Sequence, residues 1–368
     1  MKSGPNNVEK SDAAVMKEQE AKLTPKQFFM NILNGLALGT VIVLIPGALL
    51  GELFRALLPV FPAGEMILNA TSLSNSMMGF ACGFIVGLVF KFTPIQSTSL
   101  GLATMFAGGA ASFVDGGIAL ASTGDIINMG IAASIGVLIV LFFQNKLVDY
   151  HLLIIPTLVL LVAGGIGVFT LPYVVQINTL VGSFIMQLLD FQPLLMSILI
   201  SMVFAFLIVS PLTTVGIAVA ISLAGIGSAA ANLGIVATSF SLAIAGWKVN
   251  PVGTGIVHIL GSPKISMPVA IAKPLTMVPV FANAAVTGAF AAIFGLEGTP
   301  MSAGFGISGL IGPINAINLT ADGWTLQNIL IITLVFVVVP IVFGFIFNYI
   351  FTKVWPIVKP EDYKIIVN

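Results

Sequence analysis

The chain has 368 residues, of which 58% are apolar and 8% are charged, and its formal net charge is zero. Soluble domains carry about 25% charged residues, so this chain could not cover a surface that faces water and must face lipid. Its zero net charge and the lack of a basic stripe argue against nucleic acid as a partner. The single cysteine, Cys82, excludes an internal disulfide and a cysteine-based metal site, and is expected to be a small packing residue.

Apolar runs long enough to cross a bilayer recur along the chain. About 20 apolar residues are needed to span the hydrocarbon core as a helix, and the short alternating strands of a membrane β-barrel are missing from the sequence. We therefore predict an all-α polytopic membrane protein. The clearest spans are 28–54, 75–92, 124–144, 151–174, 193–218, 229–247, 274–295 and 325–353.

Both ends of the chain are polar. Residues 1–26 hold five lysines and four acids and lack the apolar core of a signal peptide, so we predict a disordered tail there and a second tail over 356–368. Lysines near the outermost spans place both termini in the cytoplasm by the positive-inside rule, which requires an even number of crossings. These lysines are Lys22, Lys26, Lys353, Lys359 and Lys364.

Three apolar segments are rich in Gly, Pro, Ser and Thr, namely 94–121, 251–272 and 297–318. This composition favours broken helices or re-entrant loops, which survive at membrane depth only where they are buried in protein or line a watery cavity. If 94–121 and 251–272 each cross once, the total is about ten transmembrane helices. Their composition equally permits a segment that turns back.

Short matches in the same order suggest an internal repeat. "FKFTPIQSTS" at 90–99 is similar to "WKVNPVGTGI" at 247–256, and "LLIIPTLVLLV" at 152–162 is similar to "ILIITLVFVVV" at 329–339. The repeats would cover 27–180 and 191–355. Five crossings in each would invert the second relative to the first, an arrangement typical of transporters that bind substrate near the midplane on discontinuous helices.

Polar side chains are costly in lipid, so those in the interrupted segments are candidates for function. His258 can donate to one sugar hydroxyl and accept from another, or it can form a structural hydrogen bond to a helix carbonyl. Glu297, next to Thr299 in a Gly-Thr-Pro turn, can accept hydrogen bonds from two hydroxyls, or it can cap a helix. Asn283 lies among small residues, where it binds substrate or bonds across a helix contact.

Other polar residues are expected at the membrane surface. His151 sits at a helix entrance beside Asp149, and Asp115 lies in a Gly-Gly turn. Lys264 and Lys273 could attract a phosphate, but we expect them to extend to the lipid headgroups. The sequence has no Walker loop, dinucleotide fingerprint, HExxH or GxSxG motif, so no cofactor and no catalytic residue are predicted.

Together with the interrupted helices, the stretch "GLEGTP…GFGISGLIGPI" resembles the membrane-embedded IIC subunits of the bacterial sugar phosphotransferase system. The resemblance covers about residues 25–355, and is nearest to the IIC-like branch that includes the perfringolysin regulator. It implies that His258 and Glu297 bind a sugar, with Asn250 and Thr254 lining the pocket. The glucose-type family motif places its glutamate after Gly-Ile-Thr, whereas Glu297 precedes Gly-Thr-Pro, so that correspondence is loose.

The resemblance implies a permease for a sugar or related small polar solute in the bacterial cytoplasmic membrane, acting as a homodimer. Any phosphoryl transfer would need a separate IIB partner, because the two polar tails are expected to be too short to fold as a IIA or IIB domain. Two other functions stay open. One is a membrane sensor that binds a small molecule and regulates through a partner, and the other is a secondary transporter of an organic anion that uses Lys264.

Overall fold

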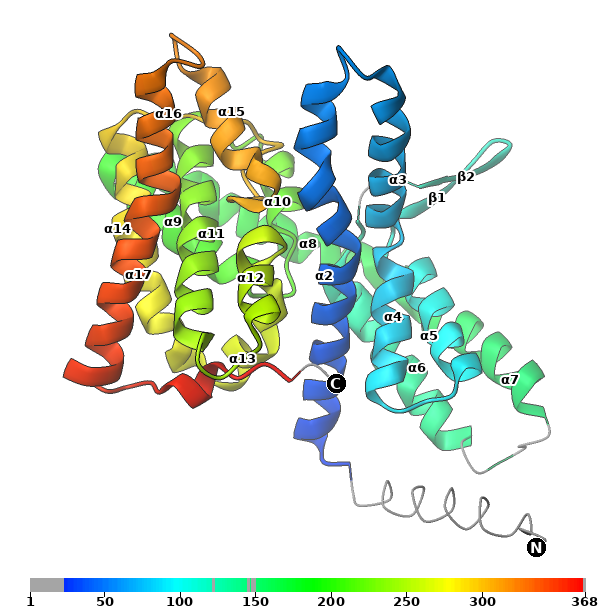
Figure 1. Ribbon diagram of the computed structural model, residues 1–368. Helices are drawn as coiled ribbons and strands as arrows, with labels where there is room; N and C mark the ends of the chain where they lie inside the picture. Colours follow the sequence, from blue (N-terminus) through cyan, green and yellow to red (C-terminus); the bar gives the residue numbers. More distant parts are fainter. Residues whose placement is uncertain (1–22, 121–122, 144–145, 147–149, 367–368) are drawn as a thin grey trace, which may run out of the picture.

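The computed structural model describes residues 23–120, 123–143, 146 and 150–366 (Figure 1). The described residues are mostly helical, so the predicted all-α polytopic class is confirmed. Six of their helices are long and apolar enough to cross a bilayer, and a seventh span results if the bent pair Pro62–Ser76 and Met78–Val89 is counted as one. Most of the predicted tail, residues 1–22, lies outside the described residues.

The first half of the chain forms the bundle that Figure 1 draws in blue to green. Its elements are α2 (Pro25–Leu57), the short turn η1 (Pro62–Gly64), α3 (Glu65–Ser76), α4 (Met78–Val89), α5 (Pro94–Ala107), β1 (Ala111–Val114), β2 (Gly117–Leu120), α6 (Ile126–Phe143), α7 (His151–Leu158), the π-helical η3 (Val159–Gly164) and α8 (Gly165–Leu188). The last three run on as one apolar helix of 38 residues.

The second half forms the bundle drawn in green to red. Its elements are α9 (Pro193–Ile208), α10 (Thr214–Ala220), α11 (Gly225–Gly246), α12 (Val252–Leu260), η4 (Pro263–Ser266), α13 (Met267–Ala272), η5 (Pro274–Thr276), α14 (Met277–Ile293), η6 (Ser308–Leu310), α15 (Ile311–Leu319), α16 (Leu326–Thr333), the π-helical η7 (Leu334–Val338), α17 (Val339–Tyr349), the π-helical η8 (Ile350–Val354) and η9 (Pro360–Tyr363).

Local sequence signals explain where two of the first helices begin. Thr24 and Thr93 each accept a hydrogen bond from the backbone of a glutamine three residues later, and that glutamine bonds back to the threonine N–H. A proline follows each threonine at the first helical position, where its missing N–H is not needed. The capping signals therefore fix the starts of α2 and α5.

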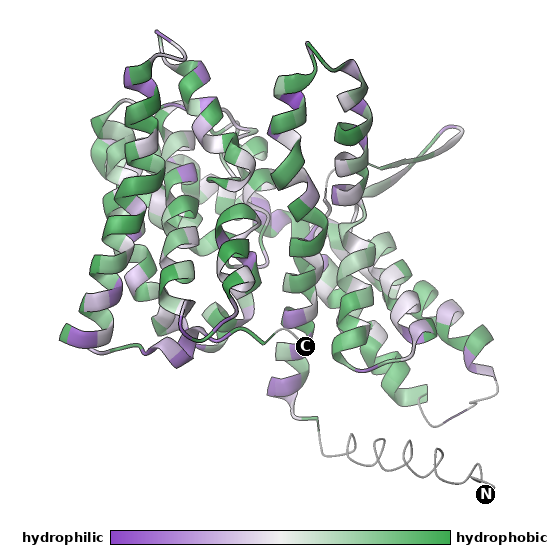
Figure 2. Cartoon of the chain, in the orientation of Figure 1, coloured by the Kyte–Doolittle hydropathy of each residue, from purple (hydrophilic) through white to green (hydrophobic). Residues whose placement is uncertain are grey.

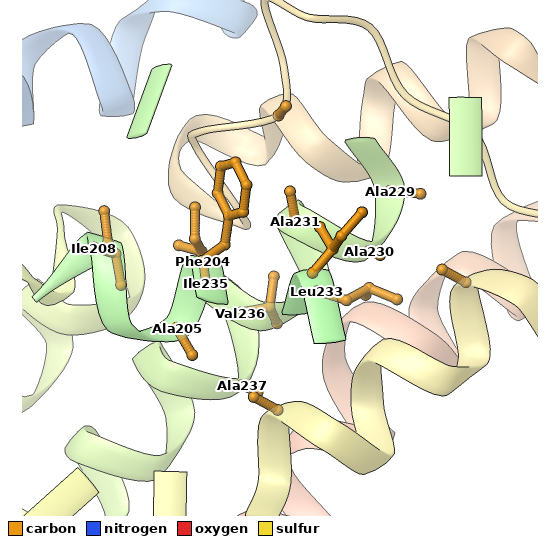
Figure 3. Close-up of a cluster of buried hydrophobic side chains, with 14 of the residues drawn as sticks. Phe204, Ala205, Ile208, Ala229, Ala230, Ala231, Leu233, Ile235, Val236 and Ala237 are labelled. Carbon is orange, nitrogen blue, oxygen red and sulfur yellow. The ribbon is translucent and has the colours of Figure 1, made fainter. Parts of the chain in front are cut away.

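Two hydrophobic cores hold the bundles. One is built on α2, α4, α5 and α6, and it contains the fully buried Cys82, as predicted. The other surrounds α11, whose side chains are nearly all buried. Figure 3 shows this second core, where Phe204, Ala205 and Ile208 of α9 lie beside the small residues of α11. Alanine and glycine on α11 let the neighbouring helices approach closely.

The outer surface is as apolar as a lipid-facing surface must be. Large exposed apolar side chains cover α8 and the helix from α16 to η8, for example Phe169, Leu180, Leu330 and Phe345. Figure 2 shows α16 and α17 mostly in green. Because lipid tails are apolar, such side chains need no protein partner.

The structure has fewer long spans than the ten expected. Residues 94–120 of the predicted segment 94–121 hold the 14-residue α5 and then a β-hairpin, in which Ala111 pairs with Leu120 and Val114 with Gly117. Asp115 lies in the turn of this hairpin, as expected for a Gly-Gly turn. The predicted span 193–218 is interrupted between α9 and α10, where Pro211 cannot donate a backbone hydrogen bond.

Candidate functional site

Two helical hairpins approach each other in the second bundle. The first hairpin is residues 251–273, with α12, η4 and α13, and the second hairpin is residues 296–319, which end in α15. The nine residues of α12 extend only about 14 Å, less than half of the hydrocarbon core. In Figure 1, α12 lies in the lower half of the bundle and α15 in the upper half. The helix α15 also has nine residues, so neither helix is long enough to cross the hydrocarbon core alone.

The two hairpins meet at their tips. The Ser308 hydroxyl of the second hairpin donates to the Gly261 carbonyl of the first at 2.5 Å. Both tips also lie against α2, because a Cβ atom on Gly261 would be 3.2 Å from Ile45, and one on Gly309 would be 2.5 Å from the Ala48 carbonyl oxygen. The tips thus join the second bundle to the first.

The helix α2 is itself weakened at this contact. Pro46 lies inside α2, between the two residues that the tips approach. A proline there has no N–H for the carbonyl four residues earlier, so it breaks one backbone hydrogen bond and favours a bend. The tips of the two hairpins therefore meet α2 beside its internal proline.

The tip of the second hairpin holds an unusual backbone. Gly306, Gly309 and Leu310 have φ values of 62°, 61° and 58°. This region suits glycine, but it strains a residue such as leucine, and strain of this kind concentrates at functional sites. Gly306 is fixed by the Asn232 side chain of α11, which accepts its N–H at 2.9 Å.

Lys264, at the tip of the first hairpin, is 4% exposed, so the expectation that it reaches the headgroups is wrong. Its ammonium nitrogen donates to the Ser210 carbonyl at 2.6 Å and to the Leu212 carbonyl at 2.9 Å. Both carbonyls belong to the break between α9 and α10. They lack helical partners and face the negative end of the α9 dipole, and this polarity compensates the buried positive charge.

His258 is buried in α12, and both of its ring nitrogens have partners. Nε2 lies 2.7 Å from the Ser266 hydroxyl, while Nδ1 lies 3.0 Å from the Thr254 carbonyl. The bond to the carbonyl is the structural hydrogen bond foreseen as the alternative role of this histidine. The bond to Ser266 ties the two arms of the first hairpin together just beside Lys264.

Asn250 and Lys273 close the base of the first hairpin on the C-terminal segment. The Asn250 side chain donates to the Tyr363 carbonyl at 2.9 Å and accepts the Ile365 N–H at 2.8 Å. Lys273, also expected at the headgroups, bonds to Asp362 at 2.8 Å.

That bond is the main reason why the pKa of the Asp362 carboxyl is below its ordinary value of 3.8. The bond between Lys273 and Asp362 therefore adds to the free energy of unfolding when the pH is above the ordinary pKa of the carboxyl. This contribution is lost as the pH falls through the lowered pKa of the folded protein. The C-terminal segment is therefore bound to the base of the hairpin at neutral pH.

Glu297 and Thr299 lie at the outer end of the second hairpin, away from its tip. The Glu297 side chain is exposed, and its neighbour Gly298 pairs with Gly225 at the start of α11. The Thr299 N–H donates to the Asn315 side chain at 2.9 Å, so this threonine helps to close its own hairpin. The hydrogen bond between the two hairpins joins Ser308 to Gly261. It does not involve His258 or Glu297.

Asn283 is fully buried in α14 and bonds across helix contacts. Its amide donates to Ser241 of α11 at 2.8 Å and to the Pro340 carbonyl of α17 at 2.9 Å, and its oxygen accepts from Thr287. Through these bonds Asn283 joins α14 to α11 and α17.

The structure brings together only part of the predicted site. Thr254 and His258 share one helix beside the tip, whereas the other candidates are distributed between the base of the first hairpin, the outer end of the second and α14. Lys264 was predicted to extend to the lipid headgroups. Its position between Gly-Ser-Pro and an apolar run was the signal that it is buried at a turn. His151 lies where expected, at a helix entrance, 2.9 Å from the Phe143 carbonyl.

A cavity of about 190 Å³ lies on the far side of the second hairpin, between α15 and the helix that α16 begins. Its walls are almost entirely apolar, with Leu310, Ile314, Trp324 and Phe336 among the lining residues. Such a lining offers few partners for hydroxyl groups, so this cavity is a poor site for a polar solute.

Comparison with known proteins gives one match. A family described as "Phosphotransferase system, EIIC" matches residues 30–365, which is nearly the whole chain. No curated protein and no solved structure matches the chain.

Proposed function

The chain belongs to the phosphotransferase system EIIC family, and we propose that it moves a sugar or a related small polar solute across the bacterial cytoplasmic membrane by alternating access. The observation that carries this proposal is the meeting of the two hairpins against α2, with the tip of each supplying polar groups. Sites at such junctions become accessible from either side when one bundle moves against the other.

We place the solute at the hairpin tips, where His258, Thr254 and Lys264 present polar atoms. An imidazole can donate to one hydroxyl and accept from another, and a hydroxyl of the solute can replace that of Ser266 as the partner of the His258 Nε2 atom. The roles in binding predicted for Asn250, Asn283, Glu297 and Thr299 stay predictions. Asn250 and Asn283 could contact a solute only after their present hydrogen bonds are broken.

In this proposal the two bundles correspond to the repeats 27–180 and 191–355, with both termini in the cytoplasm. Two observations support the repeat. The matching segments 90–99 and 247–256 both hold a proline at a helix start, Pro94 as the first residue of α5 and Pro251 just before α12. The matching segments 152–162 and 329–339 both run into a π-helical stretch. A homodimer and a separate IIB partner are part of the proposal as what the family implies.

A thermal-shift screen against sugars, sugar phosphates, polyols and small carboxylates tests the substrate class. A ligand that binds the folded state raises the melting temperature by an amount that depends on its concentration relative to its Kd. We expect a neutral sugar to raise the melting temperature of the native chain. The shift should disappear in His258→Ala and persist in His151→Ala, and its loss in Glu297→Gln would support the separate prediction that Glu297 binds the solute.

Ser266→Ala is the matched control for His258, because it removes the same hydrogen bond without removing the imidazole. Retained binding in Ser266→Ala, with loss in His258→Ala, would assign His258 to the solute. A shift with carboxylates alone would instead favour the organic-anion transporter, for which the buried Lys264 is the supporting observation. If no compound shifts the melting temperature, the sensor becomes the better hypothesis.

A further inference from the structure

The apolar cavity behind the second hairpin has an exposed rim and a buried floor. Its volume is about 190 Å³, and its walls come from residues 307–337. Leu310 and Trp324 at the rim are more than half exposed, whereas Ile332 and Phe336 at the floor are buried. The cavity therefore opens on the outer surface of the second bundle, where large apolar side chains of α16 face the lipid.

The rim of this cavity lies at the level of the membrane surface. Trp324 lies just before the apolar helix Leu326–Val354, and Trp355 directly follows it. Tryptophans that flank a span mark the two lipid–water interfaces, and Figure 1 draws the turn between α15 and α16 at one extreme of the molecule. From Ile329 to Val337 the lining residues cover about 12 Å of helix, and half of the hydrocarbon core is about 15 Å. The cavity therefore runs from one interface towards the middle of the bilayer.

The lining of the cavity calls for an apolar occupant. Trp324 and Thr333 are the lining residues whose side chains carry polar atoms, and the Trp324 indole N–H already donates to the Asn318 side chain at 2.7 Å. A buried water needs about two to four polar partners, and apolar cavities of about 150 Å³ stay dry and take up apolar molecules. An empty cavity would also deprive its walls of dispersion contacts.

We propose that an acyl chain of a membrane phospholipid occupies this cavity, with its headgroup beside the turn between α15 and α16. Phospholipid chains are the apolar molecules that the bilayer brings to the rim. They also lie along the direction in which the cavity runs, from the interface towards the midplane. The site does not depend on which solute the protein moves.

The charges near the rim favour phosphatidylethanolamine over a free fatty acid. Between Glu297 and Lys353 the sequence has one charged residue, Asp322. It is exposed in the turn just before Trp324. A fatty-acid carboxylate at the rim would be repelled by Asp322 and would find no lysine or arginine on α15 or α16. The amine of phosphatidylethanolamine is instead attracted to this aspartate.

The bound chain supports the tip of the second hairpin. Ile307 and Leu310 line the cavity on the hairpin side, and Leu310 has the left-handed φ of 58°. A leucine keeps such a conformation only where its surroundings hold it there. Ser308, between these two residues in the chain, bonds to Gly261 of the first hairpin. The acyl chain therefore stabilises the contact between the two hairpins.

Lipid binding by the detergent-purified chain tests the proposal. Native mass spectrometry counts the phospholipids that stay bound, and thermal unfolding measures what added dioleoyl phosphatidylethanolamine contributes to stability. We expect one bound phosphatidylethanolamine per chain and a saturable rise in the melting temperature. Oleate has the same acyl chain but a carboxylate, and should give neither. A larger rise with oleate, or no bound lipid and no rise with either compound, would overturn the proposal.

Filling the cavity separates this site from the lipid that coats the whole surface. Thr333→Phe and Ile314→Phe each place a ring in the cavity, one from α16 and one from α15, so the bound lipid and its stabilising effect should both be lost. Leu330→Phe is the matched control, because Leu330 is an exposed residue of α16 outside the cavity. It should retain the lipid. Loss of the lipid from all three variants, or from none, would contradict the site.

A measurement on the unfilled cavity keeps the proposal testable if both filled variants misfold. Trp247→Phe combined with Trp355→Phe leaves Trp324 as the single tryptophan of the chain. Phosphatidylethanolamine with brominated acyl chains should quench its fluorescence, and the quenching should saturate at one lipid per chain. Quenching that grows with the lipid concentration without saturating would be that of general lipid contact, and would count against a defined site.

Discussion

Lys264→Met is expected to reduce uptake of the solute at least about tenfold and to lower the free energy of unfolding by about 2 kcal/mol. Methionine fills similar space but leaves the carbonyls of Ser210 and Leu212 without donors, and each unpaired buried carbonyl costs about 1–3 kcal/mol. The loss is partly offset because the variant no longer buries a charge. We expect uptake to fall by more than the loss of folded protein alone would cause, because the tip of the first hairpin is no longer held against the break between α9 and α10.

Lys273→Met is the matched control, since Lys273 is a half-exposed lysine at the base of the same hairpin. It should lose its ion pair with Asp362 and retain most of its uptake, because exposed ion pairs contribute about 0–1 kcal/mol. Uptake assays in vesicles and melting curves separate the two effects. Equal uptake in Lys264→Met and Lys273→Met would mean that the buried ammonium has no part in transport.

Gly234→Ala is expected to destabilise the second bundle by about 3 kcal/mol or more. Gly234 lies where α11 crosses α9, and a Cβ atom there would be 2.7 Å from the Ser201 carbonyl carbon and 2.9 Å from its Cα. Both atoms are helix backbone, so neither can rotate away as a side chain could. The two helices would have to separate, and their core would lose contacts along its length.

Gly51→Ala is the control, in which we expect no decrease in the free energy of unfolding. Gly51 lies inside α2, and a Cβ atom there would meet nothing within 4 Å. Alanine favours a helix over glycine by up to about 1 kcal/mol, so this variant should be neutral or slightly stabilised. Reversible unfolding of the two variants side by side checks the prediction. A stable Gly234→Ala would show that α9 and α11 do not pack this closely.

Composition and apolar periodicity were enough to predict most of the fold. The observed helices agree within a few residues with the predicted spans 124–144, 229–247 and 325–353. The agreement is good because a helix satisfies all backbone hydrogen bonds within its own segment, as lipid requires. The interruption at 251–272 was also predictable from its glycines and prolines. The short lengths of α12 and α13 were not predictable, because the composition of this segment fits both a broken helix and a loop.

The polar contacts were much harder to predict. Hydrogen bonds of Lys264 to residues 210 and 212, or of Asn178 to Asp125, join positions more than fifty residues apart. No local pattern encodes such contacts. The β-hairpin at 111–120 was missed for a different reason: its apolar residues looked like the continuation of a membrane segment, and the Gly-Gly turn was assigned to the surface without its flanking strands.

The most direct test of the central claim is thiol labelling of Ser308→Cys in right-side-out and inverted vesicles with a membrane-impermeant maleimide. The native Cys82 is fully buried and serves as the unreactive background. If the solute binds at the hairpin tips and reaches them from either side, the introduced thiol reacts in both kinds of vesicle, and a stabilising sugar slows the reaction several-fold. Met301 is an exposed residue of the same hairpin, so Met301→Cys should be labelled at a rate that the sugar does not change. Labelling of Ser308→Cys that no ligand slows, or that occurs from one side only, would contradict an alternating-access site at this junction.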